Sequence, residues 1–273
     1  TKGFQSSSEP LLHFGYGEVR KIDSLYIIWP DNTYEKKYDV AVNQSLQFKP
    51  SENRETVDYS QLFPKANPWF EKLNAIPGLE YRHQENRFID FNQQKLIPYK
   101  ISDRGPAVVV NDLNGDGRDD VFFGGAKSQA AKVFLQANGR FIEKRYESIA
   151  FDSLREDVSA IIEDLNNNGS NDLFVVSAGG EFTEDNEALR DRLYMNEAGT
   201  FTKGKLPSYL VKGAVVKAHD YNKDGYVDLF VGGAAVAKDF GKIPKSYLLK
   251  NNKGVFEIIE NNALENLGMV TDA

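Results

Sequence analysis

The sequence predicts an all-β protein whose main part is a row of β-propeller blades, preceded by a small partial β domain. Three observations predict this fold class. An acidic nine-residue motif occurs three times, short runs of β-branched and aromatic residues flank every copy, and each copy precedes a hairpin pattern. The copies are DLNGDGRDD at 112–120, DLNNNGSND at 164–172 and DYNKDGYVD at 220–228. Four strands in a period of about 50 residues are typical of a propeller blade.

The acidic motif is a candidate loop for a hard cation. Oxygen-bearing side chains stand at positions 1, 3, 5 and 9, position 6 is glycine, and position 7 would add a backbone carbonyl. Calcium takes about six to eight oxygen ligands, and the glycine permits the bend that lets these oxygens converge. We therefore expect calcium as the cofactor. The predicted ligands are Asp112, Asn114, Asp116, Arg118, Asp120, Asp164, Asn166, Asn168, Ser170, Asp172, Asp220, Asn222, Asp224, Tyr226 and Asp228.

The motif has two other possible interpretations. An EF-hand needs a glutamate at position 12 and a helix on each side. Position 12 is Phe123, Val175 or Val231, and flanks such as Ala107–Val110 and Leu173–Val176 are typical of buried strands. The EF-hand is therefore excluded. A metal-free turn rich in Asp, Asn and Gly stays open, since these residues also form turns without any ion.

Composition limits the possible functions. The net charge of −7 and the lack of a basic stripe argue against a nucleic-acid partner. No apolar run approaches the ~20 residues of a transmembrane segment. The absence of cysteine excludes disulfides and thiolate sites. His13, His83 and His219 are scattered, which argues against a histidine-based zinc site.

Residues 1–50 predict a small β unit. Asp23–Trp29 alternates as a strand should, Pro30–Asn32 supplies a turn, and Tyr34–Val40 and Ser45–Phe48 follow as further strands. Three short strands bury too little surface to be stable alone. We therefore expect these residues to be part of a domain.

The next stretch predicts a linker and then the edge of the propeller. The composition turns polar after Pro50, which indicates a linker over residues 51–77. Within them, Trp69–Leu73 would begin a short helix that Pro77 and Gly78 end. Residues 78–91 show strand-like patterns and would supply the outer strands of a blade.

Residues 78–273 predict the propeller segment, with three repeats and the start of a fourth. Each repeat ends in a hairpin with a glycine at the turn and an aromatic residue after it. These hairpins are Lys132–Phe141, Arg192–Phe201 and Ser246–Phe256. Gly268–Ala273 resembles the lead-in to an acidic loop, which would begin just beyond Ala273. Since a propeller closes with about four to eight blades, we expect further blades of the same longer chain as partners.

The motifs resemble two known families. The loops, with the Phe-Gly-Gly or Val-Gly-Gly that follows, resemble FG-GAP/VCBS repeats, the calcium-binding blades of integrin-like propellers. Segments 12–17, 22–25, 29–31 and 42–44 resemble the C-terminal part of an ASPIC/UnbV domain. The string from Tyr81 to Ala107 is similar to bacterial proteins that join both. The resemblance implies an exported protein at the cell surface, associated with the outer membrane, or in the periplasm.

Two function classes follow. The favoured one is a non-enzymatic, calcium-stabilised binding or scaffold module with a protein or glycan ligand. The alternative is part of a polysaccharide-active enzyme. His83 with Glu85 is the one pair that suggests acid–base work, and a structural pair is the favoured interpretation. We therefore predict no catalytic residue. The insert Gly179–Glu187 is expected to be a solvated loop, although loops of this length are often functional.

Overall fold

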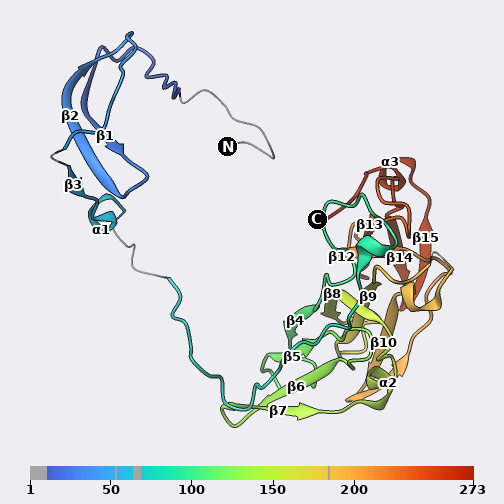
Figure 1. Ribbon diagram of the computed structural model, residues 1–273. Coiled ribbons are helices and arrows are strands. Elements are labelled where there is room, and N and C mark those ends of the chain that lie inside the picture. Colours follow the sequence, from blue (N-terminus) through green and yellow to red (C-terminus); the bar gives the residue numbers. More distant parts are fainter. Residues whose placement is uncertain (1–10, 53, 64–68, 184) are drawn as a thin grey trace. The chain divides into compact units, whose positions relative to one another are not determined.

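The computed structural model describes residues 11–52, 54–63, 69–183 and 185–273. It divides into two compact units, one up to Lys72 and one from Leu73 onward. The described residues form one three-stranded and three four-stranded antiparallel sheets, so the predicted all-β class is confirmed (Figure 1). None of the helices in the described part of the chain is long and apolar enough to cross a membrane.

The first unit is a hairpin with a short third strand. Strands β1 (Lys21–Ile28) and β2 (Thr33–Ala41) pair across the predicted turn, where Asn32 adopts φ 61°. Ser45–Phe48, expected to be a strand, forms none. Instead β3 (Glu55–Thr56), inside the expected linker, pairs with β2, and the helix α1 (Tyr59–Leu62) follows. The chain leaves the sheet after β2, where Asn43 adopts φ 59°.

The second unit contains three propeller-type blades, each of four strands in chain order (Figure 1). The first blade is β4 (Val108–Asn111), β5 (Asp120–Phe123), β6 (Lys132–Ala137) and β7 (Arg140–Lys144). The second is β8 (Glu156–Glu163), β9 (Asp172–Ala178), β10 (Arg192–Glu197) and β11 (Thr200–Lys203). The third is β12 (Lys212–His219), β13 (Asp228–Ala235), β14 (Tyr247–Asn252) and β15 (Val255–Ile259).

These blades agree closely with the predicted repeat. Every acidic loop connects the first and second strands of a blade, and every predicted hairpin joins the third and fourth. The short helices α2 (Glu147–Ala150) and α3 (Asn262–Glu265) follow the fourth strands of the first and third blades. The flank at Ala107–Val110 is the exception to the predicted burial, because Val108 and Val110 are each 54% exposed.

The stretch before the first blade differs from its prediction. No helix forms at 69–77 and no strand at 78–91, where one 3-10 turn, η1 (Asp90–Asn92), stands. Trp69, Phe70 and Leu73 are 96%, 89% and 66% exposed, so the expected apolar helix face is not buried. Residues 64–68 of the expected linker lie outside the described residues.

The extended chain at 77–84 is held to the first blade by long-range bonds. Pro77 accepts the amide N–H of Phe141 (2.8 Å), and the Gln129 side chain bonds to the backbone of Arg82 and Gln84 (2.9 and 2.8 Å). These side-chain and single backbone bonds replace a regular strand ladder.

Two apolar layers hold the blades together, one between each pair of neighbours. Strand β9 contributes to both, because alternate residues of a strand point to opposite faces. Leu173 and Val175 pack toward the first blade, whereas Phe174 and Val176 pack toward the third. All four side chains are fully buried. This explains why the strand is continuously apolar in sequence.

A buried asparagine ties each of the last two blades to the loop of the blade before it. The Asn196 amide donates to the carbonyls of Leu113 (3.0 Å) and Asn171 (2.9 Å). Asn251 repeats this pattern with Leu165 (2.7 Å) and Val227 (2.9 Å). Neighbouring blades are therefore joined by directed hydrogen bonds as well as by apolar contact.

We predict that Asn251→Ala destabilises the protein by about 1–3 kcal/mol, since it leaves buried carbonyls without a donor. Urea unfolding followed by circular dichroism would measure the change. Gln136 occupies the same position in the first blade and is half-buried, so Gln136→Ala should stay within about 0.5 kcal/mol of the parent. Equal effects of both changes would contradict the role of the asparagine.

Candidate functional site

The three acidic loops share one hydrogen-bond plan at their first positions. The position 1 carboxylate accepts the N–H of position 5 and the N–H of the position 6 glycine. For Asp112 these bonds are 3.2 and 2.7 Å, and Asp164 and Asp220 repeat them at 3.1 and 2.8 Å and at 3.1 and 2.9 Å. The glycines Gly117, Gly169 and Gly225 adopt φ 80°, 83° and 90°, a left-handed conformation that explains the residue type.

The position 9 carboxylates connect each loop to its blade. One oxygen accepts the N–H of loop position 2, and the other accepts an N–H of the third strand. Asp172 does this with Leu165 (3.0 Å) and Asn196 (2.7 Å). Asp120 and Asp228 repeat it with Leu113 and Gln136 and with Tyr221 and Asn251. All three are almost completely buried.

Loop two departs from its neighbours at position 5. In loops one and three the position 3 amide donates to the position 5 carboxylate, from Asn114 to Asp116 (3.3 Å) and from Asn222 to Asp224 (2.8 Å). Loop two has Asn168 at position 5 in place of an aspartate, and the Asn168 side-chain amide donates to the backbone carbonyl of Asn196 (3.0 Å). An aspartate could not make this bond, because an ionised carboxylate only accepts. The neutral residue therefore has a structural role that the sequence did not reveal.

The loops lie side by side along the blades. The Asn171 amide of loop two donates to the carbonyl of Asp112 in loop one (2.6 Å), and Asn167 donates to Gly225 in loop three (2.9 Å). Neighbouring loops are thus joined by direct hydrogen bonds.

Like charges gather in the loops. Burial raises the pKa of Asp120, and the neighbouring carboxylates Asp116 and Asp112 raise it further. The pKa of Asp172 is raised by burial and by Asp164. Side-chain oxygens and closely placed like charges are the chemistry that a calcium ion would complement. The residues present therefore fit calcium, although they also satisfy the bonding of a metal-free turn.

The positions predicted as ligands are all found in these loops, but their carboxylates do not form the tightest group of ligand atoms. Among the described residues, three His, Asp or Glu side chains bring ligand atoms within 4.8 Å of one another at His83, Glu85 and Glu156. The sequence indicated the first two residues but not Glu156. The pair of acidic residues Glu156 and Asp157 at the start of β8 was the one available signal.

The elements around this group fix it firmly. The Tyr81 ring stacks on Phe123 with centroids 4.3 Å apart, and its hydroxyl donates to the carbonyl of Gly124 (2.8 Å). His83 Nδ1 lies 3.0 Å from the Tyr81 hydroxyl, and His83 Nε2 lies 2.5 Å from Glu85 Oε1. Glu156 begins β8, which packs against the first blade. Burial, together with the neighbouring carboxylates of Glu85 and Glu181, raises the pKa of Glu156 to about 8.

The insert at 179–187 is less solvated than expected. The Phe182 side chain is buried and that of Glu181 is 4% exposed, beside the 3-10 turn η2 (Glu187–Leu189). Gly180 packs so closely on Asp90 that a Cβ there would lie 2.1 Å from Asp90 Oδ1. This close approach draws the insert onto the body of the unit. Residue 184 of the insert lies outside the described residues.

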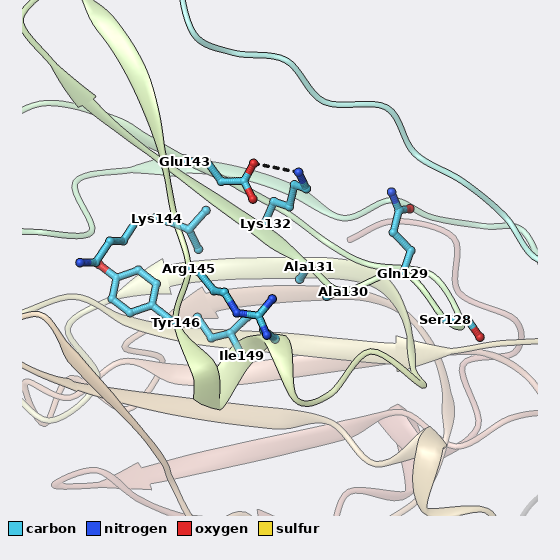
Figure 2. A pocket seen from close by; sticks show the side chains of 12 residues that line it. Ser128, Gln129, Ala130, Ala131, Lys132, Glu143, Lys144, Arg145, Tyr146 and Ile149 are labelled. Carbon is cyan, nitrogen blue, oxygen red and sulfur yellow. Dashed lines mark hydrogen bonds and ion pairs between the residues drawn. The ribbon is translucent and has the colours of Figure 1, made fainter.

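The surface of the second unit also carries two cavities. One, of about 260 Å³, lies between the Ser128–Val133 segment and Glu143–Ala150, and Figure 2 shows Lys132 and Glu143 paired at its edge (2.8 Å). The other, of about 560 Å³, is lined by Lys127, Arg155 and Phe182 among others. In the first cavity the drawn ion pair already satisfies both charges, so it is a weaker candidate for an ion than the histidine group.

Comparisons with known proteins agree with the two resemblances. A family model described as ASPIC and UnbV matches residues 1–55, and one described as FG-GAP-like repeat matches residues 112–175 and 164–231. A comparison with curated proteins found no match. Among solved structures, an Agrocybe aegerita lectin described as recognising non-reducing terminal N-acetylglucosamine is 22% identical, with a TM-score of 0.37.

The match to this lectin covers 59% of the present chain and 38% of the lectin. A likeness of this size gives no basis for assigning a ligand. The family models, in contrast, coincide with the loops and with the first β unit that the structure describes. The chain therefore combines an ASPIC and UnbV segment with FG-GAP-like repeats.

Proposed function

We propose that this chain is a non-enzymatic, calcium-stabilised scaffold module of an exported or surface protein, and that it binds a protein or a glycan. The observation that carries the proposal is the row of three acidic loops bonded to one another across consecutive blades. Calcium held there would neutralise gathered carboxylates and stiffen the edge on which the loops stand. Loops fixed on a rigid scaffold are common recognition surfaces.

The ligands we assign to calcium are the side chains at positions 1, 3, 5 and 9 and the carbonyls at position 7. Calcium supplies no reaction step in this proposal. Its contribution is stability, because an ion that binds the folded form alone stabilises that form by mass action. Binding to a glycan array, or capture of a protein partner, in calcium and in chelator would test the recognition role. A ligand that binds equally well in both conditions would contradict a calcium-stabilised surface.

We predict that the three loops contribute unequally to calcium-dependent stability. Loops one and three each offer three carboxylates at the ligand positions, whereas loop two offers two because Asn168 is neutral. Ligand charge is a determinant of calcium affinity. Asp116→Ala and Asp224→Ala should therefore lose more of the calcium-dependent rise in melting temperature than Asn168→Ala. Calcium titrations followed by differential scanning fluorimetry would measure it.

The reciprocal variant separates charge from structure. Asn168→Asp should increase the calcium-dependent rise but lower the melting temperature in chelator, because the bond to the Asn196 carbonyl is lost. The graded-site idea would be refuted by a parent protein whose melting temperature does not respond to chelator, or by the largest loss in Asn168→Ala.

We also predict that this chain does not turn over polysaccharides. Around His83 the Glu85 carboxylate bonds the ring, and the loop carboxylates accept backbone N–H groups. Reducing-sugar assays on plant and host polysaccharides should stay at background. Reproducible turnover that His83→Ala abolishes would favour the enzymatic alternative instead.

A further inference from the structure

The hydrogen bonds around His83 contain one acceptor more than the available donors can satisfy. Tyr81 has one hydroxyl proton, and this proton goes to the Gly124 carbonyl, which can only accept (2.8 Å). The Tyr81 oxygen must then accept from His83 Nδ1–H (3.0 Å). In the neutral ring this leaves the lone pair of Nε2 facing Glu85 Oε1 at 2.5 Å. Two acceptors at that distance require a positive charge, which is either a proton between them or a metal cation that both bind after they move apart.

A second, independent observation comes from Glu156. Glu156 is 1% exposed, and its Oε1 atom has no hydrogen-bond partner among the described residues. Its other oxygen, Oε2, accepts the backbone N–H of Lys127 at 3.4 Å. A buried carboxylate oxygen without a partner is costly, so Oε1 calls for a ligand. Oε1 and the His83 ring face the same space beside Gly105, because a Cβ on that glycine would lie 3.1 Å from Oε1 and 3.6 Å from His83 Cε1.

The surrounding charges favour a cation. Glu181 lies close enough to raise the pKa of Glu156, and its own Oε2 also has no partner among the described residues. Asp157 is already paired with the buried guanidinium of Arg192. The Lys127 ammonium lies 3.6 Å from Glu181 Oε1 and offsets one charge. When all three are ionised, Glu85, Glu156 and Glu181 outweigh the one ammonium of Lys127, and a divalent cation would balance their charge.

We propose that His83 Nε2, one oxygen of Glu85 and Oε1 of Glu156 bind a divalent first-row transition-metal ion. Imidazole together with carboxylates is a donor set that suits ions such as Zn²⁺ and Mn²⁺. Around Zn²⁺, ligand atoms at ~2.1 Å lie roughly 3.4 Å apart, so atoms already within 4.8 Å need to move by about an ångström. The site differs from the calcium loops both in position and in its nitrogen ligand.

The site is accessible and its ring is already oriented. The side chains of His83 and Glu85 are 16% and 28% exposed, which leaves a path for the ion and room for water as a further ligand. The hydrogen bond from Nδ1 to Tyr81 fixes the tautomer that presents Nε2 to a metal, the usual arrangement of a ligating histidine.

Metal titration of the full chain tests this proposal. Zn²⁺ and Mn²⁺ would be titrated by calorimetry in millimolar calcium, which occupies the acidic loops, and Co²⁺ absorption would report nitrogen ligation. The parent should bind one equivalent, with Zn²⁺ tighter than Mn²⁺. Glu85→Gln and Glu156→Gln should each weaken metal binding by about 10–100-fold or more. Loss of a residue that only supports a metal ligand already costs this much, and these two glutamates are direct ligands.

Matched variants make the result specific. Glu163→Gln changes another partly buried glutamate of β8 outside the group, and should bind as the parent does. His13→Gln and His219→Gln control for the other imidazoles, whereas His83→Gln should remove the Co²⁺ spectrum. If His83→Gln does not fold, the affinity of Glu85→Gln still tests the proposal, because Glu85 is exposed and its substitution should not disturb folding. The proposal is overturned if the parent binds no transition metal, if both glutamine variants keep parental affinity, or if binding follows His13 or His219.

Discussion

The buried carboxylate at the ninth loop position is the constraint on which the rest of the second unit depends. Each of these aspartates accepts one N–H from its own loop and one from the third strand of its blade, with no access to water. Loss of the carboxylate would leave two buried donors unsatisfied, a cost of about 1–3 kcal/mol each. The same backbone amide that Asp172 holds belongs to Asn196, whose side chain reaches the preceding loop. One carboxylate therefore shapes a loop, completes a blade and positions the bond to its neighbour.

The glycine pairs in or just after the second strands have a related physical reason. A Cβ at Gly124 would lie 2.5 Å from the Asp157 Cβ of the next blade, and one at Gly232 would lie 2.7 Å from Val270 Cγ1. Only glycine allows the neighbouring segment to approach this closely. Where the pair stands at the edge of the first blade, it brings Glu156 and Asp157 beside the histidine segment. The repeat motif and the candidate transition-metal site are thus products of the same close packing.

The repeat was predictable because its determinants are local. Turn glycines, alternating oxygen side chains and short apolar runs lie within a few residues of one another, and the period identified the blades. The segment 69–106 was not predictable in the same way. Its position depends on bonds such as Gln129 to Arg82 and Tyr81 to Gly124, which join residues more than 40 positions apart. Glu156 and the second role of Asn168 were missed for the same reason, since their partners come from distant strands.

Amide hydrogen exchange with and without chelator tests most directly whether the carboxylates, rather than an ion, hold the blades together. The account predicts that the amides of Gln136, Asn196 and Asn251, which donate to the position 9 carboxylates, stay protected in chelator. The amides of Gly117, Gly169 and Gly225 at the outer bend should exchange faster once calcium is removed. Loss of protection at Asn196 and Asn251 on chelation, to the same degree as at the glycines, would contradict it.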